Sequence, residues 1–357
     1  MRVLFFGTYD TGTHPRVLVL AQGLRARGAS VTQCNAPLGI STAERVSAVR
    51  RPWRAIPLAG RLARRWWTLA RSARRGAAPD AVVVGYLGLL DVHLARLLFG
   101  RTPLVLDHLA AAADTAADRR LGGGVRVLSM VDDLALRRAD VLVVDTDEQR
   151  AALPPAARAK AVVCAVGAPD AWFAAEPSTA DGPLRVVFFG LYTPLQGAPA
   201  IGAAAALLAG RPVRFTMVGT GQDRAETRRA AAGAAVDWLD WAGPEELPGL
   251  VAGHDVCLGI FGTGPKAVRV VPNKVFQGAA AGCAVVTSDT APQRRALGDA
   301  AVFVPPGDPA ALAAALDRLA GDRPGLARLR TAARALAERE FTAERVVGPL
   351  WERIRGA

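Results

Sequence analysis

The chain has 357 residues, more than the roughly 250 to 300 at which a single hydrophobic core stops growing, so two domains are expected. Apolar residues make up 51% and charged residues 21%, a globular composition that excludes a disordered chain. No apolar run approaches the roughly 20 residues of a membrane span. The net charge of +12 is concentrated, because residues 45–75 hold ten arginines and no acid.

The first residues and the cysteines indicate a compartment. The apolar run that begins at Val3 ends at Gly7, too short for the core of a secretory signal, so we expect a cytoplasmic protein. The four cysteines form no CxxC pair, and each lies in or beside an apolar run. This pattern predicts buried thiols rather than a zinc site or disulfides.

An internal repeat is the most informative feature of the sequence. RVLFFGTY at residues 2–9 returns as RVVFFGLY at residues 185–192, with six identities in eight positions. Each copy is an apolar run that ends in glycine, as in a strand buried on both faces of a parallel sheet. A polar loop and a helical stretch follow each copy, Pro15–Gly28 in the first half and Ala198–Ala209 in the second.

Further apolar runs alternate with helical ones, so both halves are predicted to be α/β, doubly wound Rossmann-like domains. Strands are expected at Ser30–Cys34, Ala81–Val84, Pro103–Leu106, Val141–Val144 and Ala161–Val166, then at Arg214–Val218, Val236–Leu239, Val256–Ile260, Ala284–Thr287 and Val302–Val304. We expect a first domain over residues 1–170, a linker over 171–183, a second domain over 184–339 and a C-terminal helix over 340–357 that crosses back to the first domain.

Ligands of open α/β sheets bind outside the carboxyl ends of the strands, which singles out the loop after Gly7. Gly12 and Thr13 form this loop, and His14 and Arg16 stand where the next helix begins, at a terminus that attracts anions. The alternative is a glycine turn in which His14 only helps to start the helix.

The second domain has corresponding candidates. Gly190 ends the repeated strand and Thr193 follows it, while Gly219, Thr220 and Gly221 end the next strand. Farther on, Asn273 starts a helix, and Lys266, Arg269 and Lys274 place three cations within nine residues at its N-terminal end. These charges repel one another and the helix dipole, a conflict that a bound diphosphate would relieve. A solvated loop is the alternative.

The segments TPLQG, VGTG, GHDVCLGIFG and PNKVFQGAAAGCAVVTSD, in this order, resemble glycosyltransferases of the GT-B fold, of the retaining group 1 (family 4) type. The resemblance covers the second half of the chain and, more loosely, the first. It implies two Rossmann-like domains that face a central cleft, with a nucleotide-diphosphate sugar bound by the second domain and the acceptor by the first. It implies no metal and no further cofactor.

Departures from the family pattern affect the donor site. The family's diphosphate-binding arginine and lysine correspond to Leu191 and Gln196, and its two glutamates correspond to Arg269 and Gln277. We therefore expect Lys266, Arg269 and Lys274 to supply the missing positive charge, and an inactive homologue is the competing interpretation. The expected diphosphate site is Thr193, Lys266, Arg269 and Lys274, and the nucleotide site is Gly190, Gly219, Thr220, Gly221, Asn273 and Gln277.

Polar residues at other strand ends of the first half are catalytic candidates. Asp107 and His108 follow one strand, and with His14 they form the expected catalytic set, unless Asp107 caps a helix and His108 is packed. Asp114 and Asp118 are weaker candidates for acceptor hydroxyls. The DTD motif at 145–147 mimics a metal-binding DxD, but Thr146 with Gln149 fits a capping box that opens a helix, the interpretation we favour.

The arginine-rich segment 45–75 also has apolar periodicity. Leu58, Leu62, Trp66, Leu69 and Ala73 form one stripe flanked by arginines, as in a helix that lies on an anionic membrane surface. A helix packed on the first domain, with its arginines in water, is the alternative. No nucleic-acid module surrounds the segment, so nucleic-acid binding is not expected.

The sequence thus predicts an enzyme that moves a sugar from a nucleotide-diphosphate sugar to an acceptor hydroxyl, on an envelope polysaccharide, a glycolipid or a natural product. Cations and helix N-termini would stabilise the departing diphosphate. A sugar-nucleotide epimerase of the same fold and a non-catalytic partner subunit at the membrane remain alternatives.

Overall fold

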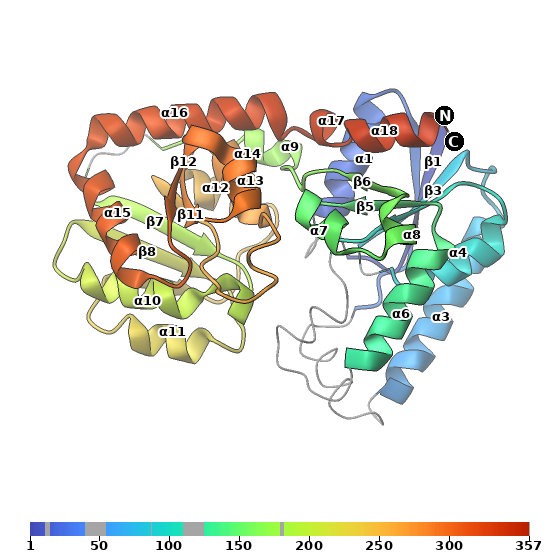
Figure 1. Ribbon diagram of the computed structural model, residues 1–357, viewed down its shortest axis with the longest axis horizontal. Coiled ribbons are helices and arrows are strands. Elements are labelled where there is room, and N and C mark those ends of the chain that lie inside the picture. The colour runs from blue at the N-terminus through green and yellow to red at the C-terminus, as the bar shows by residue number, and fades with distance from the viewer. Residues whose placement is uncertain (11–14, 40–54, 87, 110–124, 179–181, 357) are drawn as a thin grey trace. The chain divides into compact units, whose positions relative to one another are not determined.

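The computed structural model describes residues 1–10, 15–39, 55–86, 88–109, 125–178 and 182–356 (Figure 1). The chain divides into two compact units, unit 1 (Met1–Ala165 with Ala343–Ala357) and unit 2 (Val166–Thr342). The first division falls before residue 170, where the first domain was expected to end, and the second falls after residue 340, where the C-terminal helix was expected to begin. Helix α9 (Asp170–Phe173), in the stretch expected to be a linker, packs within unit 2 against α12 (Leu247–Ala252) and α13 (Asn273–Ala280).

Unit 1 is built on a parallel sheet of six strands in the order β2-β1-β3-β4-β5-β6. The strands are β1 (Arg2–Gly7), β2 (Ser30–Asn35), β3 (Ala81–Val84), β4 (Leu104–Asp107), β5 (Val141–Val144) and β6 (Ala161–Val163). Because β1 lies inside the sheet, between β2 and β3, its apolar run is covered on both faces, as the repeat predicts.

Helices cover both faces of the unit 1 sheet. On one face α1 (Arg16–Ala26) and α18 (Gly348–Arg355) pack on a core that includes Phe5, and α17 (Ala343–Val346) packs on α1. On the other face the core that includes Phe6 is covered by α3 (Ala55–Ala73), α4 (Asp91–Phe99) and α6 (Val125–Arg138). The short helices α7 (Asp147–Ala152) and α8 (Pro155–Arg158) connect β5 to β6.

Unit 2 repeats the architecture with the strand order β12-β11-β10-β7-β8-β9, all parallel. The strands are β7 (Leu184–Phe189), β8 (Val213–Val218), β9 (Val236–Leu239), β10 (Val256–Leu258), β11 (Ala284–Ser288) and β12 (Ala301–Val304). The two halves of the repeat are therefore equivalent strands of two doubly wound sheets, and the predicted fold class is confirmed.

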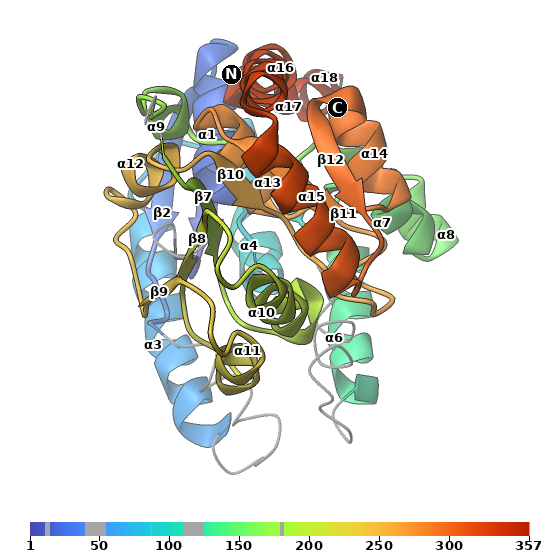
Figure 2. The ribbon, with the colours of Figure 1, turned by 90° about the vertical axis from the view of Figure 1, so that its left-hand side faces the viewer.

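Helices of unit 2 also cover two faces. On one face α10 (Ala198–Leu207) and α15 (Pro309–Gly321) lie side by side over a core of apolar residues (Figure 2). Helix α13 packs on β10 and β11. A Cβ added to Gly278 would lie 2.5 Å from Cβ and Sγ of Cys257, so only glycine permits this close approach. The remaining helices are α11 (Arg224–Ala230), α14 (Ala291–Leu297) and the long α16 (Arg323–Glu340).

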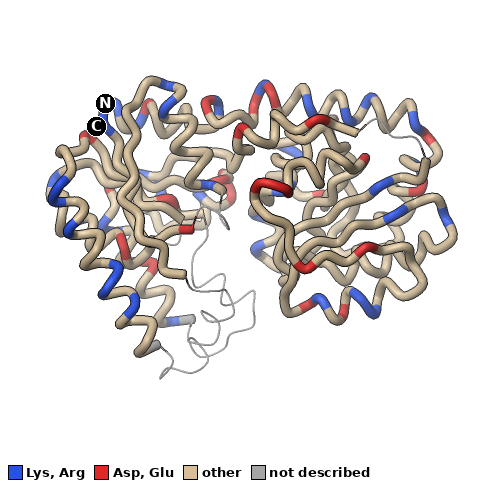
Figure 3. The backbone as a smooth tube through the Cα atoms, turned by 180° about the vertical axis from the view of Figure 1, so that it is seen from behind, with Lys and Arg blue, Asp and Glu red and all other residues tan. Residues whose placement is uncertain are grey.

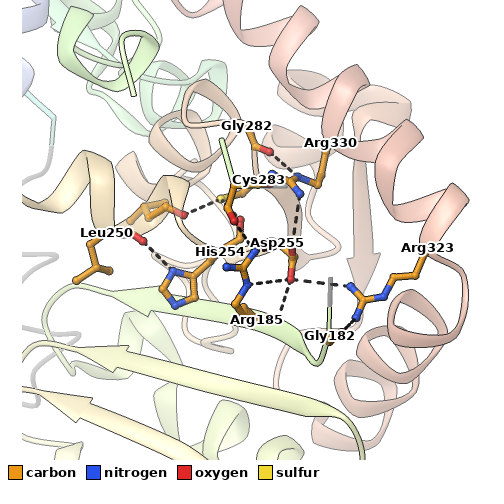
Figure 4. A network of polar contacts seen from close by, with 11 residues as sticks. Gly182, Arg185, Leu250, His254, Asp255, Gly282, Cys283, Arg323 and Arg330 are labelled. Carbon is orange, nitrogen blue, oxygen red and sulfur yellow. Dashed lines mark hydrogen bonds and ion pairs between the residues drawn. The ribbon is translucent and has the colours of Figure 1, made fainter. Parts of the chain in front are cut away.

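A buried carboxylate anchors α16 to the sheet of unit 2 (Figure 4). Asp255 accepts a hydrogen bond from the backbone N–H of Arg185 at 2.9 Å and forms ion pairs with Arg185 (3.3 Å), Arg330 (3.4 Å) and Arg323 (4.0 Å). Arg330 also donates to the carbonyl oxygens of Ser178 and Gly282. The network ties together the start of β7, the start of β10 and α16.

The strand boundaries lie within three residues of those expected from the sequence. Beyond Pro324 the chain is helical almost to its end, as predicted, in α16, α17 and α18. None of the described helices combines the length and the apolar character that a membrane-spanning segment requires.

Candidate functional site

Three glycines bring the loops after β7 and β8 into direct backbone contact. A Cβ added to Gly219 would lie 2.0 Å from the carbonyl oxygen of Gly190, and one added to Gly221 would lie 2.4 Å from that of Tyr192. All three glycines have positive φ, and Tyr192 N–H donates to the Thr220 carbonyl at 2.9 Å. Side chains are excluded here, so the backbone itself lines the carboxyl edge of the sheet, where ligands of such sheets bind.

Lys274 extends from the first turn of α13 to this edge. Its side chain is buried, and its Nζ donates to Oε1 of Gln196, in the turn after β7. The amine lies 4.0 Å from the centre of the Phe188 ring, and a Cβ added to Gly190 would lie 3.3 Å from Nζ. A predicted diphosphate residue is thereby brought against a predicted nucleotide residue from a different element.

Burial governs the charge of this amine. It lowers the pKa of Lys274 to about 7. The nearby thiol of Cys257 stays protonated, because burial raises its pKa to about 12. At neutral pH the Lys274 amine is therefore divided between its charged and neutral forms.

The other two predicted cations lie in the loop before α13. Arg269 and Lys266 are half-buried, and Nε of Arg269 donates to the Pro265 carbonyl at 3.1 Å within this loop. Lys274 is thus the predicted cation that the structure brings to the glycine loops.

The remaining predicted donor-site residues of unit 2 flank the same edge. Thr193 is buried at the start of the turn Pro194–Gln196 and accepts from the N–H of Gln196 at 2.9 Å through its carbonyl oxygen. Asn273 and Gln277 are one turn apart on α13, half-buried and buried, respectively. The loop closes on Gly197, where an added Cβ would lie 2.3 Å from the Phe261 backbone.

In unit 1 the described candidates form a buried pair. Arg16 starts α1, and its Nε lies 3.4 Å from Oδ1 of Asp107, with both side chains at most 1% exposed. Arg16 also donates to the carbonyl oxygens of Cys164, at 2.8 Å, and Ala165. The guanidinium expected in a ligand-facing loop is thus engaged inside unit 1.

Asp107 and His108 continue β4 at its carboxyl end. Burial raises the pKa of Asp107, and the Arg16 guanidinium opposes this rise. The backbone N–H of His108 donates to Val143 at 2.8 Å, and its side chain is buried. Gly12, Thr13, His14, Asp114 and Asp118 lie outside the described residues.

Sequence reasoning missed a second carboxylate at this edge of unit 1. Asp91, buried at the start of α4, accepts from N–H and Oγ1 of Thr8 at 2.7 and 2.8 Å and from Nε1 of Trp66 at 2.8 Å. It thus fixes the loop after β1 to α3. The only sequence signal for Asp91 was its place in the first turn of a helix. Trp66 gave no hint of this contact, because it was assigned to an apolar stripe.

The DTD motif opens α7. The hydroxyl of Thr146 accepts from the N–H of Gln149 at 3.1 Å, which confirms the capping interpretation. Asp147 pairs with Arg150 at 3.0 Å. Among the described residues, no three His, Cys, Asp or Glu side chains lie close enough together to hold a metal ion.

The apolar stripe of the arginine-rich segment packs inward. Leu69 is buried in the core of unit 1, with Trp66 and Ala73 partly buried beside it. The stripe that was expected to face a membrane is thus covered by protein along the C-terminal half of α3. An amphipathic helix can bury its apolar face in a protein core as well as in lipid. The outer face of α3 carries exposed arginines and Trp67, which is 62% exposed and on which Arg71 stacks at 4.6 Å. Figure 3 shows the basic residues of this helix as blue segments of the backbone.

Comparisons with known proteins bear on both units. Residues 183–322 match the family model described as glycosyl transferases group 1. No curated protein matches the sequence. Among solved structures, sucrose-phosphate synthase from Thermosynechococcus elongatus has a TM-score of 0.72 at 16% identity, with 99% of each chain covered. Anabaena HepE in complex with UDP-glucose has a TM-score of 0.70 at 15% identity, with 100% of each covered. A trehalose-6-phosphate synthase has 0.69 at 13%, with 100% of this chain and 99% of that one covered. At these identities the likeness establishes the fold.

Proposed function

Because the chain is a glycosyltransferase of the GT-B fold whose second unit belongs to the group 1 family, we propose that it transfers a sugar from a UDP-sugar to an acceptor hydroxyl. The observation that carries the proposal is the edge of unit 2 where Lys274 meets Gly190. A lysine amine, bare backbone and the N-terminus of α13 converge there, and this combination suits a diphosphate. The complexes of HepE with UDP and with UDP-glucose support uridine as the nucleoside.

In this proposal unit 2 acts on the leaving group. As the bond between the sugar and the diphosphate breaks, negative charge grows on the diphosphate, and the Lys274 ammonium stabilises it without having to reorganise. The glycines let the backbone approach the phosphates. The family resemblance supports retention of configuration and a reaction without a metal ion or other cofactor.

We assign the acceptor to unit 1. His108 stands at the carboxyl end of β4, the edge at which ligands of α/β sheets bind, and the buried pair of Asp107 and Arg16 holds the end of this strand in place. Its acceptor is a hydroxyl of a polysaccharide, a glycolipid or a natural product. A histidine there could accept the proton that the hydroxyl loses.

We also propose that the enzyme binds the cytoplasmic surface of a membrane through the outer face of α3. Arg61, Arg64 and Arg71 are exposed there, together with Ile56 and Trp67. Since the apolar stripe packs on unit 1, attraction to anionic lipid is the main contribution, of the order of 1 kcal/mol for each arginine near the surface.

A thermal-shift screen of the full chain tests the donor assignment. UDP-, GDP- and TDP-glucose should be compared, and a ligand at 100 times its Kd adds about 2.7 kcal/mol of stability. We expect the largest shift with UDP-glucose and little shift in Lys274→Met. Stabilisation by none of the three would contradict the proposed donor assignment, and equal stabilisation of Lys274→Met would exclude the site at Gly190.

A further inference from the structure

The Lys274 amine lies among neutral groups. Its side chain is 4% exposed, and Nζ faces the amide oxygen of Gln196, the ring of Phe188 and the bare backbone of Gly190. Tyr192, edge-on to Phe188, stays protonated because burial raises the pKa of its hydroxyl to about 12. An ammonium at this position therefore lacks the hydration that it has in water and receives dipoles instead of a counter-charge.

The elements packed on α13 do not supply that counter-charge. In the described part of the chain, β11 and α12 have no titratable side chain, and β10 contributes the protonated thiol of Cys257. Asp170 of α9 is exposed. On α16, Arg334 donates to the carbonyl oxygen of Ala280, at the opposite end of α13, and the acid Glu338 is paired with Arg334 at 2.6 Å.

The charged residues of strand β7 and of the loop that precedes α13 are all positive. Arg185 is the charged residue of β7, at its amino end, where it is held by Asp255. Lys266 and Arg269 precede α13. Both raise the cost of a third cation at its N-terminus, where the helix dipole is also unfavourable to positive charge.

We propose that Lys274 is largely neutral in the free enzyme above neutral pH and takes up a proton when the diphosphate of the nucleotide sugar binds beside Gly190. The inference rests on the proposed function and adds a proton to its donor-binding step. No covalent bond forms, and the proton comes from the solvent. The buried amine of Lys274 thus contacts the diphosphate, and it becomes charged because the diphosphate binds.

The direction of the coupling follows from the charges. In the free protein burial holds the pKa of Lys274 at about 7, and a diphosphate beside the amine supplies the missing negative charge, which raises this pKa toward its ordinary value of about 10.4. Between these two values the complex holds one more proton than the free protein. Donor affinity should therefore fall by about tenfold for each pH unit above neutrality.

Titration calorimetry of the full chain with UDP-glucose measures this proton. Run at one pH in buffers that differ in ionisation enthalpy, it gives the number of protons taken up, because each one contributes the buffer's heat. The diphosphate of UDP-glucose is fully ionised in this range and contributes none. We expect about 0.5 proton per site at pH 7 and about 0.9 at pH 8.

Two substitutions identify the group that is protonated. Lys274→Met has a similar volume without the amine, so it should bind UDP-glucose about 10- to 100-fold more weakly and without proton uptake. Lys160→Met is the matched control, because the half-buried Lys160 of unit 1 also has a lowered pKa, and its amine donates to the carbonyl oxygen of Ala139. It should keep the full uptake.

The outcomes separate this inference from the proposed function. Binding of UDP-glucose by the unaltered enzyme without proton uptake between pH 7 and 9 would overturn the coupling and leave the donor site standing. Uptake that persists in Lys274→Met would assign the proton to another group. Absence of UDP-glucose binding at any pH would remove both the donor site and the coupling.

Discussion

Replacement of Asp255 by Asn tests whether burial, rather than distance, sets the strength of the ion pairs in unit 2. The Asp255 side chain is 2% exposed, and three arginines lie 3.3 to 4.0 Å from its oxygens. Asn keeps the size of the side chain and the acceptor for the Arg185 N–H, but it leaves three guanidinium groups without their counter-charge.

The expected cost follows from the exposure of the partners. Removing one partner of a buried pair costs about 3–5 kcal/mol. The arginines are 17 to 39% exposed, so water compensates part of that loss, and we expect about 2–4 kcal/mol. For a unit of this size that loss lowers Tm by about 5–15 °C.

Asp289→Asn provides the matched control in the same unit. Asp289 lies closer to its partner, 2.5 Å from Arg294, but both side chains are largely exposed, at 40 and 57%. Such pairs contribute about 0–1 kcal/mol. A pair that is shorter but exposed should therefore matter less than three longer contacts to a buried carboxylate.

Denaturant unfolding of the full chain is monitored by hydrogen exchange in peptides of unit 2, so that the stability of this unit is measured separately from that of unit 1. In the Asp255→Asn background, Arg330→Met should recover part of the loss, because it removes an uncompensated charge, and a double-mutant cycle measures that coupling. Equal destabilisation by the two Asp→Asn variants, within about 0.5 kcal/mol, would refute the burial argument.

Three further predictions have direct readouts. Gly190→Ala should weaken UDP-glucose binding and lower the stability of the protein by about 1–3 kcal/mol, because the added Cβ meets Lys274 and the residue has a φ of +135°. Gly210→Ala is the control: its φ is also positive, but the space around it is open, so calorimetry should find unchanged affinity. Thr146→Ala should cost about 1 kcal/mol in denaturant unfolding by removing the cap of α7, and loss of UDP-glucose binding would contradict a purely structural motif. Serine at the exposed arginines of α3 should reduce sedimentation with anionic vesicles, while serine at those of α16 should not, and equal effects would argue against a specific surface.

The repeat and the strand periodicity predicted the fold because these signals are local. A strand buried on both faces needs a continuous apolar run, and a glycine at its end permits the turn, so Gly7 and Gly190 marked equivalent positions in both units. Packing of α13 was equally readable from Gly278, which leaves room for the strand beneath.

Contacts between distant segments were not readable from the sequence. Gln196 and Lys274 are 78 positions apart, and only the packing of α13 against the loop after β7 brings them together. An amphipathic stripe has the same period whether it faces lipid or protein, so the sequence alone could not tell that Leu69 is in the core and that Trp66 is bound to Asp91.

Moving the lysine amine from α13 to the loop after β7 tests whether the two positions serve the same phosphate site. Group 1 enzymes resemble this chain but have lysine at the position of Gln196, so Gln196→Lys combined with Lys274→Met transfers the amine from the helix to the loop. Gln196 is half-buried, whereas Lys274 is buried, so the relocated ammonium keeps more hydration and stays charged at neutral pH. The double variant should regain UDP-glucose affinity to within about tenfold of the unaltered enzyme and bind without proton uptake, with an affinity that no longer falls from pH 7 to 9. Calorimetry compares the affinities of the two variants for UDP-glucose. If the double variant binds no more tightly than Lys274→Met alone, the two positions are not interchangeable, and the contact between Gln196 and Lys274 does not mark one shared phosphate site.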